Sequence, residues 1–182
     1  MEWLNIRRIV VLSAVLISLA AYLFLVDMPA GKGDAPPGDE MLFPFQVEQV
    51  QRIEIRRQGQ EKPLVLERGE DGWMITSPQQ APADPERVRG LLDVFKCGYI
   101  EVIGRLPMNI AQYGLDKPDS SITLTLKQEQ GPKTRTVSFG SNNPGNTSCY
   151  ARISGDPRVL MVGILYKMEL GKDAAYYRLS QP

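Results

Sequence analysis

An uncharged apolar stretch near the start of the chain constrains its architecture more than any other feature. Residues 9–26 read IVVLSAVLISLAAYLFLV, eighteen positions without a charge. As a helix with a rise of 1.5 Å per residue, this stretch would measure roughly 27 Å, close to the ~30 Å hydrocarbon core of a bilayer. We therefore expect a single transmembrane helix over residues 9–26.

The charges that flank this stretch predict its orientation. Arg7 and Arg8 precede it, whereas Asp27 follows it, and the next residues hold one Lys and three acids. Because positively charged flanks stay in the cytoplasm, we expect residues 1–8 to be cytoplasmic and the rest of the chain to lie in the periplasm. The expected location is the inner membrane, with a single crossing.

A cleaved signal peptide is the main alternative to a permanent anchor. The apolar core of a signal peptide usually spans about 7–15 residues and ends at a small-residue site. Ser18-Leu19-Ala20 resembles such a site, but apolar residues 22–26 follow it directly. A buried helix of a soluble core is a third reading. The first two readings both export the remainder of the chain.

Composition changes sharply after the apolar stretch. Residues 27–42 read DMPAGKGDAPPGDEML, in which Pro, Gly and Asp dominate. This composition is typical of a flexible tether. Residues 43–182 then supply about 140 positions, enough for one folded domain with its own core.

The first half of this domain predicts three strands followed by a helix. Residues 52–56 alternate between apolar and charged side chains, and a return strand and a third strand follow at 64–68 and 73–76. Asp71-Gly72 is a hairpin signal between the last two. Asp84 as N-cap and Pro85 at the first helical position predict a helix that ends near Gly98.

The second half repeats this pattern less regularly. Alternating or β-branched runs predict further strands at residues 99–103, 122–127, 134–139, 149–153 and 159–162. An apolar run near the end predicts a short helix at residues 164–170. We expect an α+β domain, mainly antiparallel, with two or three helices. Two similar β-β-β-α units are one reading of this order.

Composition excludes several kinds of site. The chain holds 21 Lys and Arg against 21 Asp and Glu, no His and two Cys. Without a clustered basic excess it lacks the signature of a nucleic-acid binder. Without His it can form neither a Ser-His-Asp triad nor the usual His/Cys zinc set. We expect no enzyme activity and no cofactor.

The two cysteines, Cys97 and Cys149, leave two alternatives open. An exported domain is oxidised in its compartment, where a pair of cysteines often forms a disulfide. Such a bridge would close a loop of about 50 residues. Two buried free thiols are the other alternative, because the predicted ends of the helix and strand do not require contact.

A polar segment provides the candidate interaction loop. Residues 141–148 read SNNPGNTS and are rich in groups that could bind a sugar, an anion or a partner. We assign this role to Asn142, Asn143 and Asn146, with Tyr150 and Arg152 on the strand that follows. A turn-rich connection is the simpler reading. Trp73 is similarly either a stacking platform or a core aromatic beneath the helix.

Three short motifs resemble an uncharacterised bacterial family. They are Asp71-Gly72-Trp73-Met74-Ile75 before the helix, Tyr113-Gly114-Leu115-Asp116 with Pro118, and Phe139-Gly140 followed by Tyr150-Ala151-Arg152. The family is a domain of unknown function, usually membrane-anchored, whose members often occur with gliding-motility-type ABC transporter components. Many members carry a second copy of the unit, whereas this chain ends after one. The resemblance implies an envelope location and an accessory role.

The expected function is a non-enzymatic, membrane-anchored interaction module of an envelope assembly. The resemblance makes subunits of an ABC-type export or motility system the expected partners, and the sequence leaves the oligomeric state open. An alternative is a ligand-binding domain for an envelope glycan or lipid, with a pocket lined by Tyr99, Tyr113 and Tyr150. A hydrolase that uses carboxylates alone is a third hypothesis, and it needs two acids facing each other across a cleft.

Overall fold

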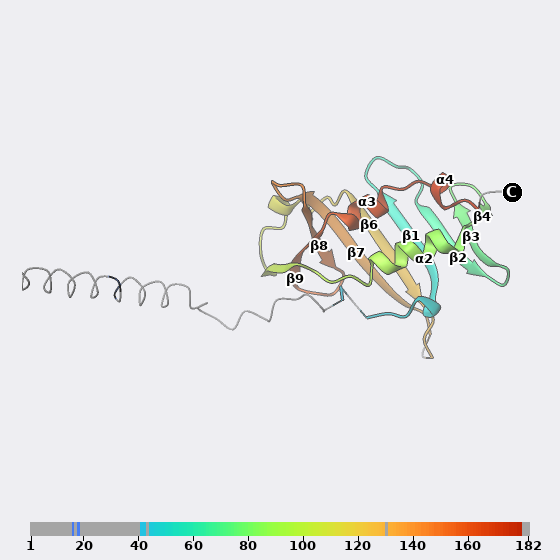
Figure 1. Ribbon diagram of the computed structural model, residues 1–182, viewed down its shortest axis with the longest axis horizontal. Helices are drawn as coiled ribbons and strands as arrows, with labels where there is room; N and C mark the ends of the chain where they lie inside the picture. Colours follow the sequence, from blue (N-terminus) through green and yellow to red (C-terminus); the bar gives the residue numbers. More distant parts are fainter. Residues whose placement is uncertain (1–15, 17, 19–40, 43, 130, 180–182) are drawn as a thin grey trace, which may run out of the picture. The chain divides into compact units, whose positions relative to one another are not determined.

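The structure, a computed structural model, describes residues 16, 18, 41, 42, 44–129 and 131–179 (Figure 1). The predicted membrane segment 9–26 lies outside these residues except for Leu16 and Ser18, and the predicted tether lies outside except for Met41 and Leu42. Within the described part of the chain, none of the helices has the length and hydropathy that a membrane crossing requires.

Nine strands and three α-helices make up the domain. Their bounds, with two short 3₁₀ helices, are η1 Val47–Gln49, β1 Val50–Arg57, β2 Leu64–Gly69, β3 Gly72–Ser77, β4 Ala81–Pro82, α2 Pro85–Val94, β5 Glu101–Arg105, η2 Ala111–Tyr113, β6 Ser120–Leu126, β7 Lys133–Asn142, β8 Ser148–Ile153, β9 Arg158–Gly163, α3 Leu165–Leu170 and α4 Ala174–Tyr177. The expected mainly antiparallel α+β domain is confirmed.

All nine strands belong to one antiparallel sheet with the order β4-β3-β2-β1-β6-β7-β8-β9-β5. Consecutive strands β1–β4 and β6–β9 each form a run of neighbours, and the two runs join through the pair β1–β6, where Ile53 lies opposite Leu124. Each run has four strands before its helix, one more than the reading as β-β-β-α units expects. Strand β5 crosses to the far edge and pairs with β9.

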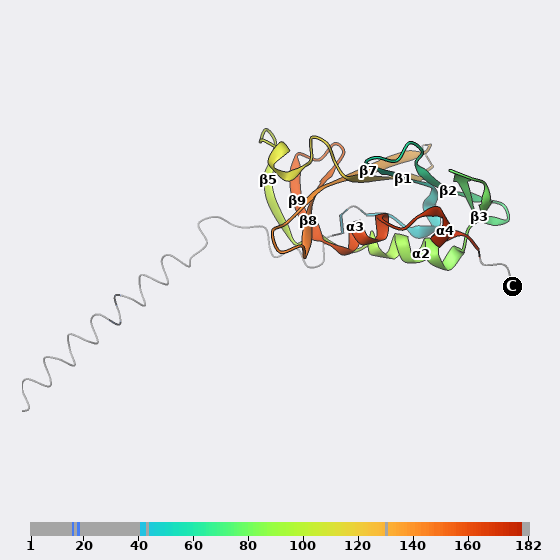
Figure 2. The same cartoon turned by 90° about the horizontal axis from the view of Figure 1, so that it is seen from above.

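The three α-helices cover one face of the sheet (Figure 2). Alternation along β6 makes this plain, because Ile122 and Leu124 are fully buried while Thr123 and Thr125 beside them are only half-buried. Side chains from α2, α3 and α4 join the inward side chains of the strands in a single core. Polar side chains such as Thr123 and Thr125 lie on the opposite face.

Helix α2 begins where the sequence predicted it, but it ends at Val94 and not near Gly98. Asp84 is the N-cap, and its Oδ1 accepts hydrogen bonds from the backbone N–H groups of Glu86 at 2.9 Å and Arg87 at 3.3 Å. Pro85 occupies the first helical position, where no intrahelical donor is needed. A cap of this kind is worth about 1 kcal/mol relative to alanine.

An aromatic cluster joins the helix layer to the sheet. The Phe95 ring lies edge-on to Phe139 and to Tyr166, with ring centroids 6.1 and 5.2 Å apart. The Tyr166 hydroxyl donates to the carbonyl oxygens of Cys97 at 2.5 Å and Gly98 at 3.1 Å. These contacts fix α3 beside the chain that leaves α2.

Two further predicted boundaries differ in the structure. The strand expected at 99–103 is β5 at Glu101–Arg105, because the Tyr99 ring turns into the core and pairing with β9 starts only at the Ile100 N–H. The polar loop is shorter than residues 141–148, since β7 extends to Asn142 and β8 begins at Ser148.

Candidate functional site

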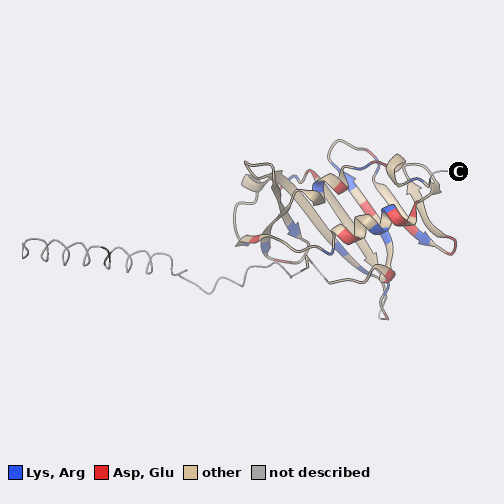
Figure 3. Cartoon of the chain, in the orientation of Figure 1, with Lys and Arg blue, Asp and Glu red and all other residues tan. Residues whose placement is uncertain are grey.

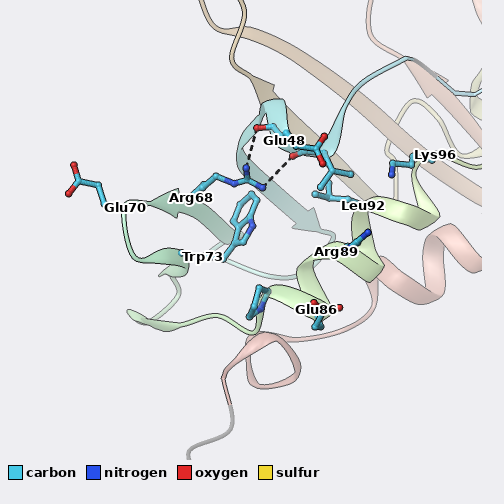
Figure 4. A pocket seen from close by; sticks show the side chains of 12 residues that line it. Glu48, Arg68, Glu70, Trp73, Glu86, Arg89, Leu92 and Lys96 are labelled. Carbon is cyan, nitrogen blue, oxygen red and sulfur yellow. Dashed lines mark hydrogen bonds between the residues drawn. The ribbon is translucent and has the colours of Figure 1, made fainter.

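A groove of about 430 Å³ lies between η1, the β2–β3 hairpin and α2 (Figure 4). Trp73 and Leu92, both buried, provide its apolar lining. Arg68 and Arg89 contribute cationic side chains from opposite sides. The sequence left two readings open for Trp73. The structure has it in the core, where it also lines the groove.

The hairpin places Arg68 against Trp73. The two residues lie directly opposite each other on β2 and β3, and Gly72 between them has a φ of 118°, which favours glycine. The Arg68 guanidinium lies 5.1 Å from the centroid of the Trp73 ring. It also donates to the carbonyl oxygens of Glu48 at 3.1 Å and Val47 at 3.4 Å. This cation–π contact is worth about 0.5–2 kcal/mol.

Both signs of charge surround this groove. Arg89 on α2 and Lys96 just beyond its end lie 4.0 and 2.9 Å from the carboxylate of Asp93, so their charges are partly compensated. Glu48 and Glu86 also line the groove, and Glu70 points away from it (Figure 4). The arrangement suits a planar or apolar group with a polar rim.

The sheet face opposite the helices presents a second candidate surface. On β1, the carboxylate of Glu54 lies 3.2 Å from the Arg52 guanidinium and 2.6 Å from that of Arg56. Arg52 also forms an ion pair with Glu67 on β2. These pairs are partly exposed, and their net contribution to stability is about 0–1 kcal/mol each.

Hydroxyl side chains continue this face across β6 and β7. Thr123 lies opposite Thr136, and their hydroxyl oxygens are 2.9 Å apart. The register places Ser121 opposite Ser138, and Ser138 in turn opposite Arg152 on β8. We call the side chains of Arg52, Glu54, Arg56, Ser121, Thr123, Thr136, Ser138 and Arg152 the polar sheet face.

The residues of the predicted interaction loop fall into two groups. Tyr150 and Arg152 are on β8, and Arg152 belongs to the polar sheet face. The ring of Tyr150 packs against Tyr113 of η2, with centroids 4.7 Å apart. Asn143 and Asn146 lie instead at the turn between β7 and β8.

Hydrogen bonds within this turn occupy its amide groups. The Oδ1 of Asn143 accepts from the N–H groups of Thr147 at 3.0 Å and Ser148 at 3.1 Å. The Asn142 amide donates to Asn146 Oδ1 at 3.2 Å and accepts from Lys167 Nζ at 2.9 Å. Loop residues that hold their own backbone in this way favour the structural reading of the segment over the binding one.

Both cysteines are free in the structure. Cys149 is fully buried on β8, whereas Cys97 is exposed just beyond α2. Burial raises the pKa of the Cys149 thiol to about 11. Of the two alternatives left by the sequence, the structure has free thiols, but only one of them is buried.

Comparison with known families matches residues 73–179, more than half of the chain, to the domain of unknown function DUF4340. The chain belongs to the DUF4340 family. The expected membership of an uncharacterised domain family is thereby confirmed. No curated protein and no solved structure matches the chain.

The DUF4340 match runs from the start of β3 to the end of α4. It therefore contains Trp73, Arg89 and the strands β6 and β7, whose hydroxyl side chains belong to the polar sheet face, while Arg68 and β1 precede it. The groove and the polar sheet face each combine residues from inside and outside the matched region.

A buried polar cluster anchors the end of the DUF4340 domain. Glu169 on α3 is buried, and its carboxylate lies 2.6 Å from Lys172 Nζ and 3.4 Å from the Tyr177 hydroxyl. Burial, together with Glu169, raises the pKa of Tyr177 far above its usual value. These groups hold α3 and α4 against the sheet.

The hypothesis of a carboxylate-only hydrolase directs attention to pairs of neighbouring acids, such as Glu70-Asp71 and Asp84 with Glu86. Asp84 caps α2, and Glu70-Asp71 form the β2–β3 turn. Within the described residues of this DUF4340 domain, no group of three or more Asp, Glu or Cys side chains is placed to hold a metal ion.

A second, more open groove of about 690 Å³ lies at the β8–β9 turn of the DUF4340 domain. Arg158 spans it and is held by Asp156, with Nη2 and Oδ2 2.8 Å apart. The aromatic pocket expected from Tyr99, Tyr113 and Tyr150 is not assembled, because Tyr99 lies beside Arg158 while the other two pair with each other. Neither groove is lined by these tyrosines.

Proposed function

We propose that the chain is a non-enzymatic, membrane-anchored accessory module of a bacterial envelope assembly, and that it binds its partner protein through the polar sheet face. An ABC-type export or motility system is the proposed assembly. The observation that carries the proposal is the arrangement of the three α-helices, which pack on the sheet face opposite to these side chains (Figure 2).

The chemistry of the polar sheet face supports a protein partner. It combines charges of both signs on β1 with neutral hydroxyls on β6 and β7 and a further cation, Arg152. Figure 3 shows the same mixture, in which Lys and Arg and Asp and Glu are interspersed along the strands. Polar groups of both signs fix the register of a partner more than they add raw affinity.

The predicted anchor supports the same proposal. A membrane segment at residues 9–26, followed by a Pro- and Gly-rich tether, would hold the domain at a high effective concentration near any partner in the same membrane. An interface of modest affinity would then be sufficient to keep the partner bound.

Site-specific photo-crosslinking tests this proposal. A photoreactive amino acid replaces Ser121 or Ser138 on the polar sheet face, and Arg89 on α2 in a control variant. Membranes are solubilised in mild detergent after irradiation, and the crosslinked proteins are identified. We expect the same envelope subunits from the two sheet positions and not from Arg89. Enrichment of no envelope subunit, or equal enrichment from Arg89, would refute the proposal.

A ligand-binding function for an envelope glycan or lipid is the second candidate, and the groove at Trp73 favours it. Its apolar lining and the Arg68 guanidinium, which is fixed by its hydrogen bond to the Glu48 carbonyl oxygen, suit a sugar ring or a lipid headgroup. The chain has two tryptophans, Trp3 and Trp73, so a Trp3→Phe variant leaves Trp73 as the only indole.

Fluorescence of this variant tests the second candidate directly. Titration with envelope glycan fragments and phospholipid headgroups should change Trp73 emission in a saturable manner, and Arg68→Gln should weaken the response. A flat emission signal with every compound would leave the groove without a ligand of these classes.

A further inference from the structure

Exposed apolar side chains gather where the chain enters the domain. Large apolar residues are usually buried, but Met41 is 42% exposed and Ile100 52% exposed, and on α3 Leu165 and Met168 are each 62% exposed. We call these four side chains the tether-side patch.

A series of contacts connects the three segments that carry the tether-side patch. Met41 forms a β-bridge with Gly98, and the Gly98 carbonyl accepts a hydrogen bond from Tyr166 on α3. Ile100 follows Gly98 by two residues, and Leu165 precedes Tyr166. Figures 1 and 2 both place α3 beside the end of α2 from which this segment leaves.

Helical geometry explains why two of these residues face outward. Tyr166, Glu169 and Leu170 point into the domain and are buried. Leu165 and Met168, three positions apart, share the opposite side of α3. Their exposure therefore follows from the way in which α3 is seated, and the described residues leave them uncovered.

We infer that the tether-side patch rests on the surface of the bilayer in which the chain is anchored. This inference rests on the proposed membrane anchor. Only 14 residues, 27–40, separate the predicted span from Met41. A flexible chain of that length has an end-to-end distance of about 20 Å, and fully extended it reaches about 50 Å. The patch lies at the point where this short tether ends.

Charge favours an apolar contact over an ionic one. Glu101 follows Ile100, and Asp39 and Glu40 precede Met41 in the sequence. On the neighbouring end of α2, Lys96 is paired with Asp93. On α3, Lys167 between Leu165 and Met168 is paired with Asp119. Each of these two lysines therefore has an acidic partner, and we expect the contact to depend on the four apolar side chains.

The native cysteine provides a reporter for this contact. Cys97 is exposed and adjoins Gly98, whereas Cys149 is fully buried and its pKa is raised to about 11. A fluorophore on Cys97 of the full chain, reconstituted into phosphatidylcholine vesicles, is exposed to lipids that carry a nitroxide quencher. The reference label is placed by Lys62→Cys in a Cys97→Ser background, at the exposed β1–β2 turn.

We expect the Cys97 label to be quenched at least about twofold more strongly than the reference, since interfacial apolar groups sit about 5–10 Å into the headgroup boundary. The double variant Leu165→Ser and Met168→Ser should lower the quenching of the Cys97 label to the level of the reference label. Met74→Ser, which removes an apolar side chain 37% exposed on β3, should leave it unchanged. Stronger quenching of the Cys97 label should not require the anionic lipid phosphatidylglycerol in the vesicles.

Each contrary result has a distinct meaning. If alkaline carbonate washes the chain from the vesicles, the proposed anchor is wrong and this inference is lost with it. If the chain stays anchored but the two labels are quenched equally, the inference alone is wrong. Quenching that survives the double serine variant, or that needs phosphatidylglycerol, also overturns it.

Discussion

The ammonium group of Lys167 on α3 lies 2.5 Å from the carboxylate of Asp119, just before β6, so one side chain ties the helix layer to the centre of the sheet. The same ammonium donates to the carbonyl oxygen of Gly140 at 2.9 Å and to Asn142 Oδ1 at 2.9 Å. The Lys167 side chain is only 19% exposed.

Replacement of this lysine should therefore weaken the fold. Lys167→Met removes the common donor of three acceptors, and we expect a loss of about 1–2 kcal/mol in the free energy of unfolding. Urea unfolding in detergent micelles, followed by tryptophan fluorescence, measures it. Lys96→Met, which removes a more exposed pair with Asp93, should cost less than about 0.5 kcal/mol. Equal losses would contradict the central role of Lys167.

Two glycines should respond in opposite directions to alanine. A Cβ at Gly140 would overlap the carbonyl oxygen of Tyr113 and lie 2.9 Å from the carbonyl carbon of Gly114, both backbone atoms that cannot move aside easily. We expect Gly140→Ala to cost about 1–3 kcal/mol.

Gly90, within α2, has no atom within 4 Å of the corresponding position. Gly90→Ala should stabilise the protein by about 0.5–1 kcal/mol, because alanine loses less backbone entropy in a helix. Thermal unfolding of both variants measures the contrast. A stabilising Gly140→Ala would show that η2 does not pack on β7 as closely as described.

The two thiols should differ in reactivity. Thiolate is the reactive form, and burial raises the pKa of Cys149 to about 11, whereas Cys97 is exposed. At mildly alkaline pH, iodoacetamide should modify one thiol per native chain and two per unfolded chain, as counted by mass spectrometry. A native chain with no reactive thiol would indicate a disulfide.

Acid should remove the contribution of one ion pair. Hydrogen bonds from the Arg158 side chain hold the pKa of Asp156 below its usual value of 3.8. Its stabilisation is therefore fully present above the unfolded pKa and is lost as pH falls through the lower, folded pKa. Asp156→Asn should destabilise near neutral pH, and the difference from the natural chain should shrink below pH 4. Urea unfolding across this range measures it, and a constant difference would exclude the ionic origin.

Local signals in the sequence were sufficient for most elements of the domain. The Asp71-Gly72 pair predicted the β2–β3 hairpin, and Asp84-Pro85 predicted the start of α2, because turns and caps depend on neighbouring residues. The pairs β1–β6 and β9–β5 carry no local signal, since their partners are far apart in the chain. Helix α4 was missed because four residues are too few for a periodic pattern.

The candidate sites were less predictable from the sequence than the fold. The sequence singled out Trp73, as a stacking platform or a core aromatic, but it did not reveal the groove beside this residue, because Glu48, Arg68 and Arg89 come from three separate elements. It also treated the amide groups of Asn143 and Asn146 as free for a ligand. The turn uses them for its own backbone and side-chain hydrogen bonds, which composition alone does not reveal.

The central position of β1 and β2 has a practical consequence for anyone who trims this chain. The family match begins at Trp73, yet the two strands before it connect β3 to β6. A fragment cut at that boundary would separate β3 and β4 from the remaining strands and remove Ile53, Ile55 and Leu66 from the interior. The smallest piece able to fold on its own must begin upstream of Val50.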